Sequence, residues 1–252
     1  MRTAGGSRAP LPLGRVMAEA LALPSLLRQR LWRGVSVPFF LMLGCALFLA
    51  VSGLHEHPRA RLALGALIFC CVAAMAVVIH RLVLLPAEQA HANASGRGLQ
   101  RFAKAIIAML GLWAVFVLSG FAAGCALLYL FAAFHLRLPP FWMQTLGAAA
   151  GAWLLARLCL VTPGVVVDQP RAWPAAWQVS RGNGWRLAAL IAIAPWLLML
   201  YVQLMWPRGV DRVIFVLVIA MSALLAIFVL FAISISYREL IARAPPPTPP
   251  PA

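Results

Sequence analysis

Long runs of apolar residues, separated by short basic or polar segments, dominate the pattern of this 252-residue chain. A run of about 20 apolar residues in a helix is long enough to cross the hydrocarbon core of a bilayer. Backbone polar groups in lipid must be paired within the protein, which favours helices for runs of this length. The pattern predicts six transmembrane helices, over residues 37–53, 62–85, 102–134, 141–162, 187–206 and 213–236.

The composition agrees with lipid as the main solvent of the protein. Hydrophobic residues make up 63% of the chain, charged residues only 11%, and the mean hydropathy is +0.91. Soluble domains carry about 25% charged residues. The net charge is +15, which in other chains can indicate a nucleic-acid partner. Here the basic residues lie in the segments between apolar runs, which is typical of membrane topology. We therefore expect membrane lipids, and no nucleic acid, as partners.

Basic residues concentrate in alternate segments of the predicted topology. The N-terminal segment, the second and fourth loops and the tail together hold 15 Arg and Lys residues, against 5 in the first, third and fifth loops. The positive-inside rule places the richer side in the cytoplasm, and six spans then leave both termini there. The expected location is the bacterial inner membrane. Residues 1–12 and the Pro-rich tail 241–252 are expected to be disordered, and residues 13–240 form one transmembrane domain.

The segment before the first span predicts an amphipathic helix on the cytoplasmic surface of the membrane. Its apolar residues recur at helical spacing, and Pro24 is expected to kink or divide the helix. A helix with one apolar face and one basic face is typical of the membrane interface. The apolar positions are Val16, Ala20, Leu23, Leu27 and Leu31.

The fourth loop predicts a second interfacial helix. Pro163 and Gly164 are expected to break the fourth span, and Pro170 suits a helix start. The run 182–184, Gly-Asn-Gly, is expected to end the helix, because Gly and Asn tolerate left-handed backbone angles. Trp173 and Trp177 then lie on one face, against the headgroups. The predicted fold is an all-α polytopic membrane protein with six transmembrane helices and two cytoplasmic interfacial amphipathic helices.

A single charge, Arg157, lies well inside a predicted span. Such residues are costly in the membrane and usually face protein or water. One interpretation is a lipid-phosphate or anion site, formed by Arg157, Arg181 and Arg186. The other is a structural clamp that holds the fourth helix to the interfacial helix. The candidate carboxylate partners of Arg157 are Asp168, Glu19 and Glu239.

Two pairs of glycines four residues apart predict close helix packing. Gly120 and Gly124 lie in the third span, and Gly147 and Gly151 lie in the fourth. Small residues at this spacing let helix backbones approach each other. Because the two spans are consecutive, we expect them to pack together; an oligomer interface is the alternative use of the same motif.

The stretch from residue 157 to 186 carries a family resemblance. The run 157–163 (RLCLVTP), Ala-Ala-Trp at 175–177 and Ser-Arg-Gly-Asn-Gly-Trp-Arg at 180–186 resemble a family of bacterial six-span membrane proteins. These are similar to the membrane domain attached to some glycerophosphoryl diester phosphodiesterases. Gly-Arg-Val at 14–16 and Tyr-Arg-Glu-Leu at 237–240 extend the resemblance over residues 13–240. We expect the loop to be a structural motif, with Pro163, Asp168, Trp177, Asn183 and Trp185 as its candidate residues.

The sequence favours a non-enzymatic function. The phosphodiesterase catalytic module is a soluble barrel with His and carboxylate residues, and nothing in this chain corresponds to it. His55, Glu56 and His57 could share a metal ion, but so short a motif is weak evidence. We therefore expect no enzymatic activity, cofactor or metal. The expected function is a non-enzymatic accessory or lipid-interacting membrane factor, and the alternative is a small-molecule or lipid transporter or permease component. A membrane-protein partner or a homo-oligomer stays open.

Overall fold

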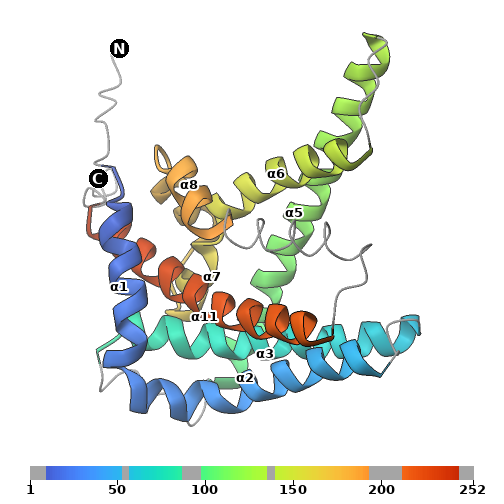
Figure 1. Cartoon of the computed structure of the whole chain (residues 1–252). Coiled ribbons are helices and arrows are strands. Elements are labelled where there is room, and N and C mark those ends of the chain that lie inside the picture. Colours follow the sequence, from blue (N-terminus) through green and yellow to red (C-terminus); the bar gives the residue numbers. More distant parts are fainter. Residues whose placement is uncertain (1–9, 53–56, 87–97, 135–139, 193–211, 244–252) are drawn as a thin grey trace, which may run out of the picture.

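The computed structural model describes residues 10–52, 57–86, 98–134, 140–192 and 212–243, and these residues form helices joined by short turns (Figure 1). No strand occurs in the described ranges. The helices are α1 (Leu13–Leu26), α2 (Arg28–Val51), α3 (Pro58–Leu84), α5 (Gly98–Ala133), α6 (Pro140–Leu158), α7 (Val161–Val166), α8 (Ala172–Val179), α9 (Gly184–Leu187), the π-helical segment η2 (Ala188–Ala192) and α11 (Arg212–Ala242).

Five described stretches are long and apolar enough to cross a membrane. They cover Arg28–Phe48, Pro58–Leu84, Gly98–Ala133, Thr145–Val166 and Leu217–Ala242. The prediction of an all-α, multi-pass membrane protein is therefore confirmed, and these stretches correspond to the predicted spans one to four and six. The remaining predicted span, 187–206, lies mostly outside the described residues, and α9 and η2 form its beginning.

The N-terminal amphipathic pattern continues from α1 into α2, with one interruption. A turn at Leu27 separates the two helices, three residues after Pro24. The apolar face of α1 is turned toward the protein, since Val16 and Ala20 are fully buried. The helix packs against α11 and lies beside its C-terminal end (Figure 1). The stripe that suggested contact with headgroups therefore belongs to the protein core.

The fourth span breaks one turn earlier than its proline. Helix α6 ends at Leu158, and α7 contains Pro163 in its first turn. Proline has no backbone N–H, and its ring clashes with the carbonyl four residues before it. For Pro163 that carbonyl belongs to Cys159, and it accepts hydrogen bonds from the N–H and hydroxyl of Thr162 instead. The prediction of a break at Pro163–Gly164 was wrong in position, because the proline disrupts the turn that precedes it.

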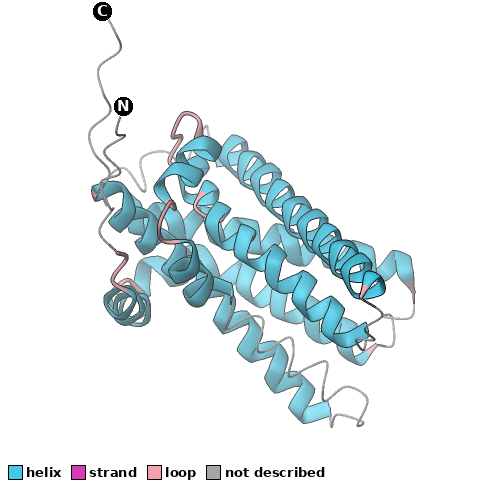
Figure 2. Ribbon diagram, turned by 90° about the horizontal axis from the view of Figure 1, so that it is seen from above, coloured by secondary structure: helices cyan, strands magenta, loops and turns pink. Residues whose placement is uncertain are grey.

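The long helices form two groups. Helices α2, α3 and α11 pack side by side, and α5 packs along α6 (Figures 1 and 2). The second group is held by the glycines that the sequence singled out. A Cβ on Gly147 would lie 2.7 Å from the carbonyl oxygen of Gly120, and one on Gly151 would lie 2.7 Å from that of Phe116. The predicted packing of these two spans is thereby confirmed.

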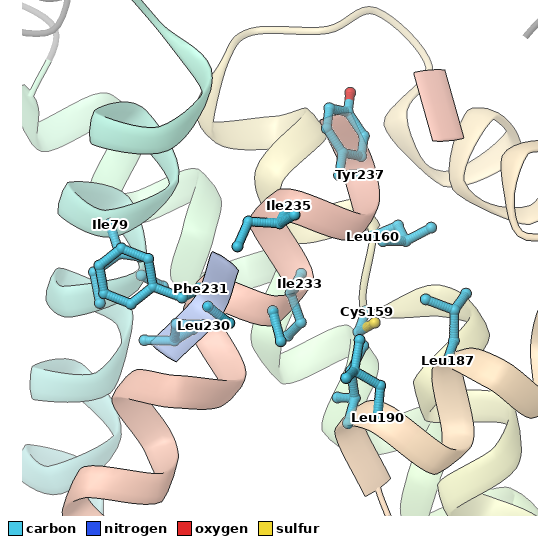
Figure 3. Packing of buried hydrophobic residues seen from close by; sticks show 14 of the residues in the cluster. Ile79, Cys159, Leu160, Leu187, Leu190, Leu230, Phe231, Ile233, Ile235 and Tyr237 are labelled. Atoms are coloured by element: carbon cyan, nitrogen blue, oxygen red, sulfur yellow. The ribbon is translucent and has the colours of Figure 1, made fainter. Parts of the chain in front are cut away.

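The buried core lies where the short helices meet the long ones (Figure 3). Ile79 of α3 and Phe231 and Ile235 of α11 are fully buried there, together with Leu160 and Leu187 from the connecting segments. The connections after α6 are therefore anchored in the core. This anchoring fixes the polar residues that the connections carry relative to the spans.

Candidate functional site

Arg157 forms the centre of the candidate site, near the end of α6. Its guanidinium carbon lies 3.6 Å from the ring centroid of Trp177 in α8 and 5.3 Å from that of Trp153 in α6. Arg157 Nε donates to Ser180 Oγ and Nη2 donates to the carbonyl of Trp177, both over a long 3.4 Å. Hydrogen bonds of this length are weak, so stacking on indole provides most of the contact. Arg157 thus joins α6 to α8, as the clamp interpretation requires.

The turn after α8 receives the N-terminal segment of the chain. Gly182 has a φ of +83°, which lets the chain reverse between α8 and α9. Asn183 Oδ1 accepts a hydrogen bond from the backbone N–H of Leu11 at 2.8 Å, and Arg186 Nη1 donates to the Leu11 carbonyl at 3.2 Å. Directly after α11, Arg243 Nη1 donates to the carbonyl of Pro10 at 2.9 Å. Three distant parts of the chain meet here.

These contacts bear on two expectations and correct the first. Leu11 is only 1% exposed, so the disorder predicted for residues 1–12 does not extend to this residue. Arg186, the third arginine of the predicted anion site, uses Nη1 to donate to the Leu11 carbonyl and so also has a structural contact. Of the three arginines in that prediction, Arg181 is the one that lies close enough to Arg157 for their like charges to repel.

The carboxylates predicted for Arg157 have other partners. Asp168 pairs with Arg101 and Lys104. The other two lie on α1 and α11 and tie those helices together: Glu19 pairs with Arg238, and Glu239 with Arg15 and Arg243. In the described part of the chain, Arg157 and Arg181 have no carboxylate within ion-pair distance.

Asp168 fixes the connection between α7 and α8 to the first turns of α5. Arg101 Nε lies 2.9 Å from one carboxylate oxygen and Lys104 Nζ lies 3.3 Å from the other. The backbone φ angles of Asp168 and Arg171 are 58° and 56°, in the left-handed region where non-glycine residues are uncommon. Partial burial acts to raise the pKa of Asp168, but the hydrogen bonds and charges of Arg101 and Lys104 outweigh it and lower the pKa below its ordinary value.

Replacing Asp168 by asparagine is expected to destabilise the fold by about 1 kcal/mol. Arg101 would lose its carboxylate while only 7% of its side chain is exposed. A fully buried pair would cost more, but the Asp168 side chain is 37% exposed and water screens it. Since the folded-state pKa is depressed, the contribution is complete above the unfolded pKa and is lost as pH falls through the folded pKa, below about pH 4. Thermal unfolding in detergent at pH 7 and pH 3 measures both effects; an equal difference between wild type and D168N at both pH values would contradict this assignment.

The four tryptophans near the site differ in their surroundings. Trp173 packs against α5, where a Cβ on Gly111 would lie 3.0 Å from its ring. Trp177 carries the Arg157 guanidinium, so the predicted Trp face of α8 is turned partly toward the protein. Trp185 is 78% exposed, and its ring centroid lies 6.2 Å from that of Trp153.

Two other polar features lie outside this cluster. His80 of α3 is fully buried, and its Nδ1 lies 2.6 Å from Ser234 Oγ of α11. In the described ranges, no three His, Cys, Asp or Glu side chains lie close enough together to hold a metal ion. His55 and Glu56 of the weak metal motif lie outside those ranges.

Sequence reasoning missed Arg101 and Lys104 as partners of Asp168. One signal was available, because the second and fourth loops lie on the same side in the predicted topology and Asp168 is the single acidic residue of the fourth loop. The hydrogen bond between the Leu11 N–H and Asn183 was not predictable, because no pattern in the sequence connects these two residues.

In the comparisons with known proteins, no family model, no curated protein and no solved structure matches this chain.

Proposed function

We propose that this chain is a non-enzymatic accessory protein of the bacterial inner membrane that binds lipid headgroups at its cytoplasmic side. The site is formed by Arg157 and Arg181 and is bordered by Trp153, Trp177 and Trp185. The observation that carries the proposal is the pairing of charges. Each carboxylate in the described ranges binds cations other than Arg157 and Arg181.

An arginine at the end of a span needs a counter-charge or water. Arg157 has stacking partners but no described carboxylate, and Arg181 beside it adds a second positive charge. Tryptophans are enriched at the level of the headgroups, where one side of the ring is apolar and the other is wet. A lipid phosphate at this level supplies the missing negative charge and can accept hydrogen bonds from a guanidinium.

The proposal includes six spans with both termini in the cytoplasm. The hydrogen bond from Arg243 to the Pro10 carbonyl supports it, because this contact brings the beginning of α1 and the end of α11 together. Five crossings alone would leave the two ends of the chain on opposite sides of the membrane. A sixth crossing between η2 and α11 brings them to the same side, which the distribution of basic residues assigns to the cytoplasm.

The resemblance to the membrane domains attached to some glycerophosphoryl diester phosphodiesterases is part of this proposal. The catalytic activity of the phosphodiesterases is not. Asn183 and Arg186 of the distinctive stretch hold Leu11. Their positions at the N-cap of α9 and within α9 agree with a structural role for the motif. The arginine at 157 stands at its beginning and supplies the binding group.

Lipid retention measured by native mass spectrometry tests the proposal. The double variant R157A/R181A is expected to keep roughly tenfold less bound anionic phospholipid than wild type, since a hydrogen bond to a charged group contributes about 1.5–3 kcal/mol. R59A is the matched control, because Arg59 is exposed and lies at the start of α3, far from the site in sequence. Equal retention by wild type and R157A/R181A would refute the lipid site.

A further inference from the structure

Trp153 presents a buried hydrogen-bond donor beside Arg157. Its indole Nε1 is shielded from solvent and has no acceptor in the described part of the chain. A buried donor without a partner costs free energy, and each such group in a native protein calls for an explanation. Among the described residues, no other tryptophan has a buried indole N–H without an acceptor.

The donor lies on the side of the ring that faces the site. The Cζ2 atom of Trp153, next to the carbon that bears Nε1, lies 3.5 Å from the Cβ position of Gly184. The same Cβ position lies 3.1 Å from Cδ of Arg157. The indole edge, the arginine stem and the backbone of Gly184 therefore meet at one point.

The side chains next to this point are either exposed or held by weak hydrogen bonds. Trp185 lies against Trp153 and is 78% exposed, so its ring has open space on its outer side. Arg157 is held mainly by stacking, with hydrogen bonds of 3.4 Å.

We infer that Trp153 is a ligand-binding residue of this site, whose indole N–H donates to a phosphate oxygen of an anionic glycerophospholipid, and that the site rejects headgroups carrying an ammonium group. This inference rests on the proposed lipid-binding function and adds a donor and a selectivity to it. Arg157 already occupies the face of Trp177, where an ammonium group would otherwise stack. With Arg181 beside it, the site has two positive charges, which repel a third cation.

Binding of defined lipids to the full-length purified protein tests the inference. Phosphatidylglycerol, whose headgroup bears only the phosphate charge, is titrated against phosphatidylethanolamine, and bound lipid is counted by native mass spectrometry. Inorganic phosphate is added as a competitor in a third series. The variants are W153F, which keeps an aromatic ring but removes the N–H, and W173F, whose ring packs on Gly111 and serves as the matched control. Size-exclusion chromatography and thermal unfolding verify that both variants fold.

Wild type is expected to bind phosphatidylglycerol at least roughly tenfold more tightly than phosphatidylethanolamine, and W153F is expected to lose roughly tenfold in affinity for phosphatidylglycerol. W173F is expected to match wild type. Equal binding of phosphatidylglycerol by W153F and wild type, equal binding of the two lipids by wild type, or displacement of the lipid by inorganic phosphate at equal concentration would each overturn the inference. If W153F has no effect while R157A/R181A still loses lipid, the inference fails and the proposed function stands; if R157A/R181A has no effect either, both fail.

Discussion

Replacing Gly147 by valine is expected to lower the stability of the helix pair α5–α6 by about 3 kcal/mol. A Cβ at this position would lie 2.7 Å from the carbonyl oxygen of Gly120, which is closer than atoms of this kind approach each other. The obstacle is backbone, so no side chain can rotate away. The two helices must separate, and the close contact between their backbones is lost. In lipid this loss is severe, because packing and not hydrophobic transfer holds the helices together.

The second glycine of the α5 pair offers a matched control. A Cβ on Gly124 would meet no atom within 4 Å, so G124A is expected to leave stability unchanged or to raise it slightly. Fluorescence-detected size-exclusion chromatography of detergent extracts, after heating to a series of temperatures, gives the apparent Tm of each variant. A G147V protein with the Tm of wild type would show that α5 and α6 are not packed through Gly120 and Gly147.

The glycine contact was predictable, since it depends on features that are local in sequence. Two consecutive apolar runs each carried glycines four residues apart, and a short connection forces such runs to be neighbours. The same reasoning placed most of the spans, because twenty consecutive apolar residues have few alternatives to crossing the membrane. It also placed the helix break near Pro163, and it erred by one turn because a proline perturbs the residues before it.

The partners of the charged residues were not predictable in the same way. Arg157 was given Asp168, Glu19 or Glu239 as candidates, but each carboxylate binds another cation. With 21 basic residues and six acidic ones, every acidic residue has many possible partners at similar sequence distances. Which pair forms depends on how helices pack in three dimensions. For Asp168 the decisive factor is that α7 lies against α5, which places the carboxylate beside Arg101.

The apolar face of α1 illustrates a different limit. The positions of Val16 and Ala20 correctly predicted an amphipathic helix, but the pattern does not state what covers the apolar face. A bilayer surface and a protein core both accept such a stripe. Both residues are buried in the core, against α11 and its neighbours. What covers the apolar face of α1 depends on residues more than 200 positions away in the chain, as the pairing of Glu19 with Arg238 illustrates. Only the tertiary structure brings such residues together.

The Asn183→Ala substitution is expected to destabilise the protein by about 2 kcal/mol and to release the N-terminal segment. The side-chain oxygen of Asn183 is the acceptor for the backbone N–H of Leu11 at 2.8 Å, and both residues are buried. Truncation leaves that N–H without a partner in a place where water does not reach it, which costs about 1–3 kcal/mol. Without this hydrogen bond, Leu11 is held less firmly. The contacts of its carbonyl with Arg186 and of Pro10 with Arg243 are then expected to weaken as well.

Limited proteolysis separates this local effect from general unfolding. In N183A, cleavage before α1 is expected to become faster than in wild type, while α5 and α6 remain protected, because their backbones contact each other directly at Gly120 and Gly147, without help from the N-terminal segment. N183D is the matched comparison: it keeps the acceptor oxygen for Leu11, so its N-terminus is expected to be cleaved more slowly than that of N183A. If N183A and wild type are cut before α1 at the same rate, Asn183 does not hold the N-terminal segment. The burial of the Leu11 side chain and the hydrogen bonds from Arg186 and Arg243 would then be sufficient to hold the N-terminal segment in place.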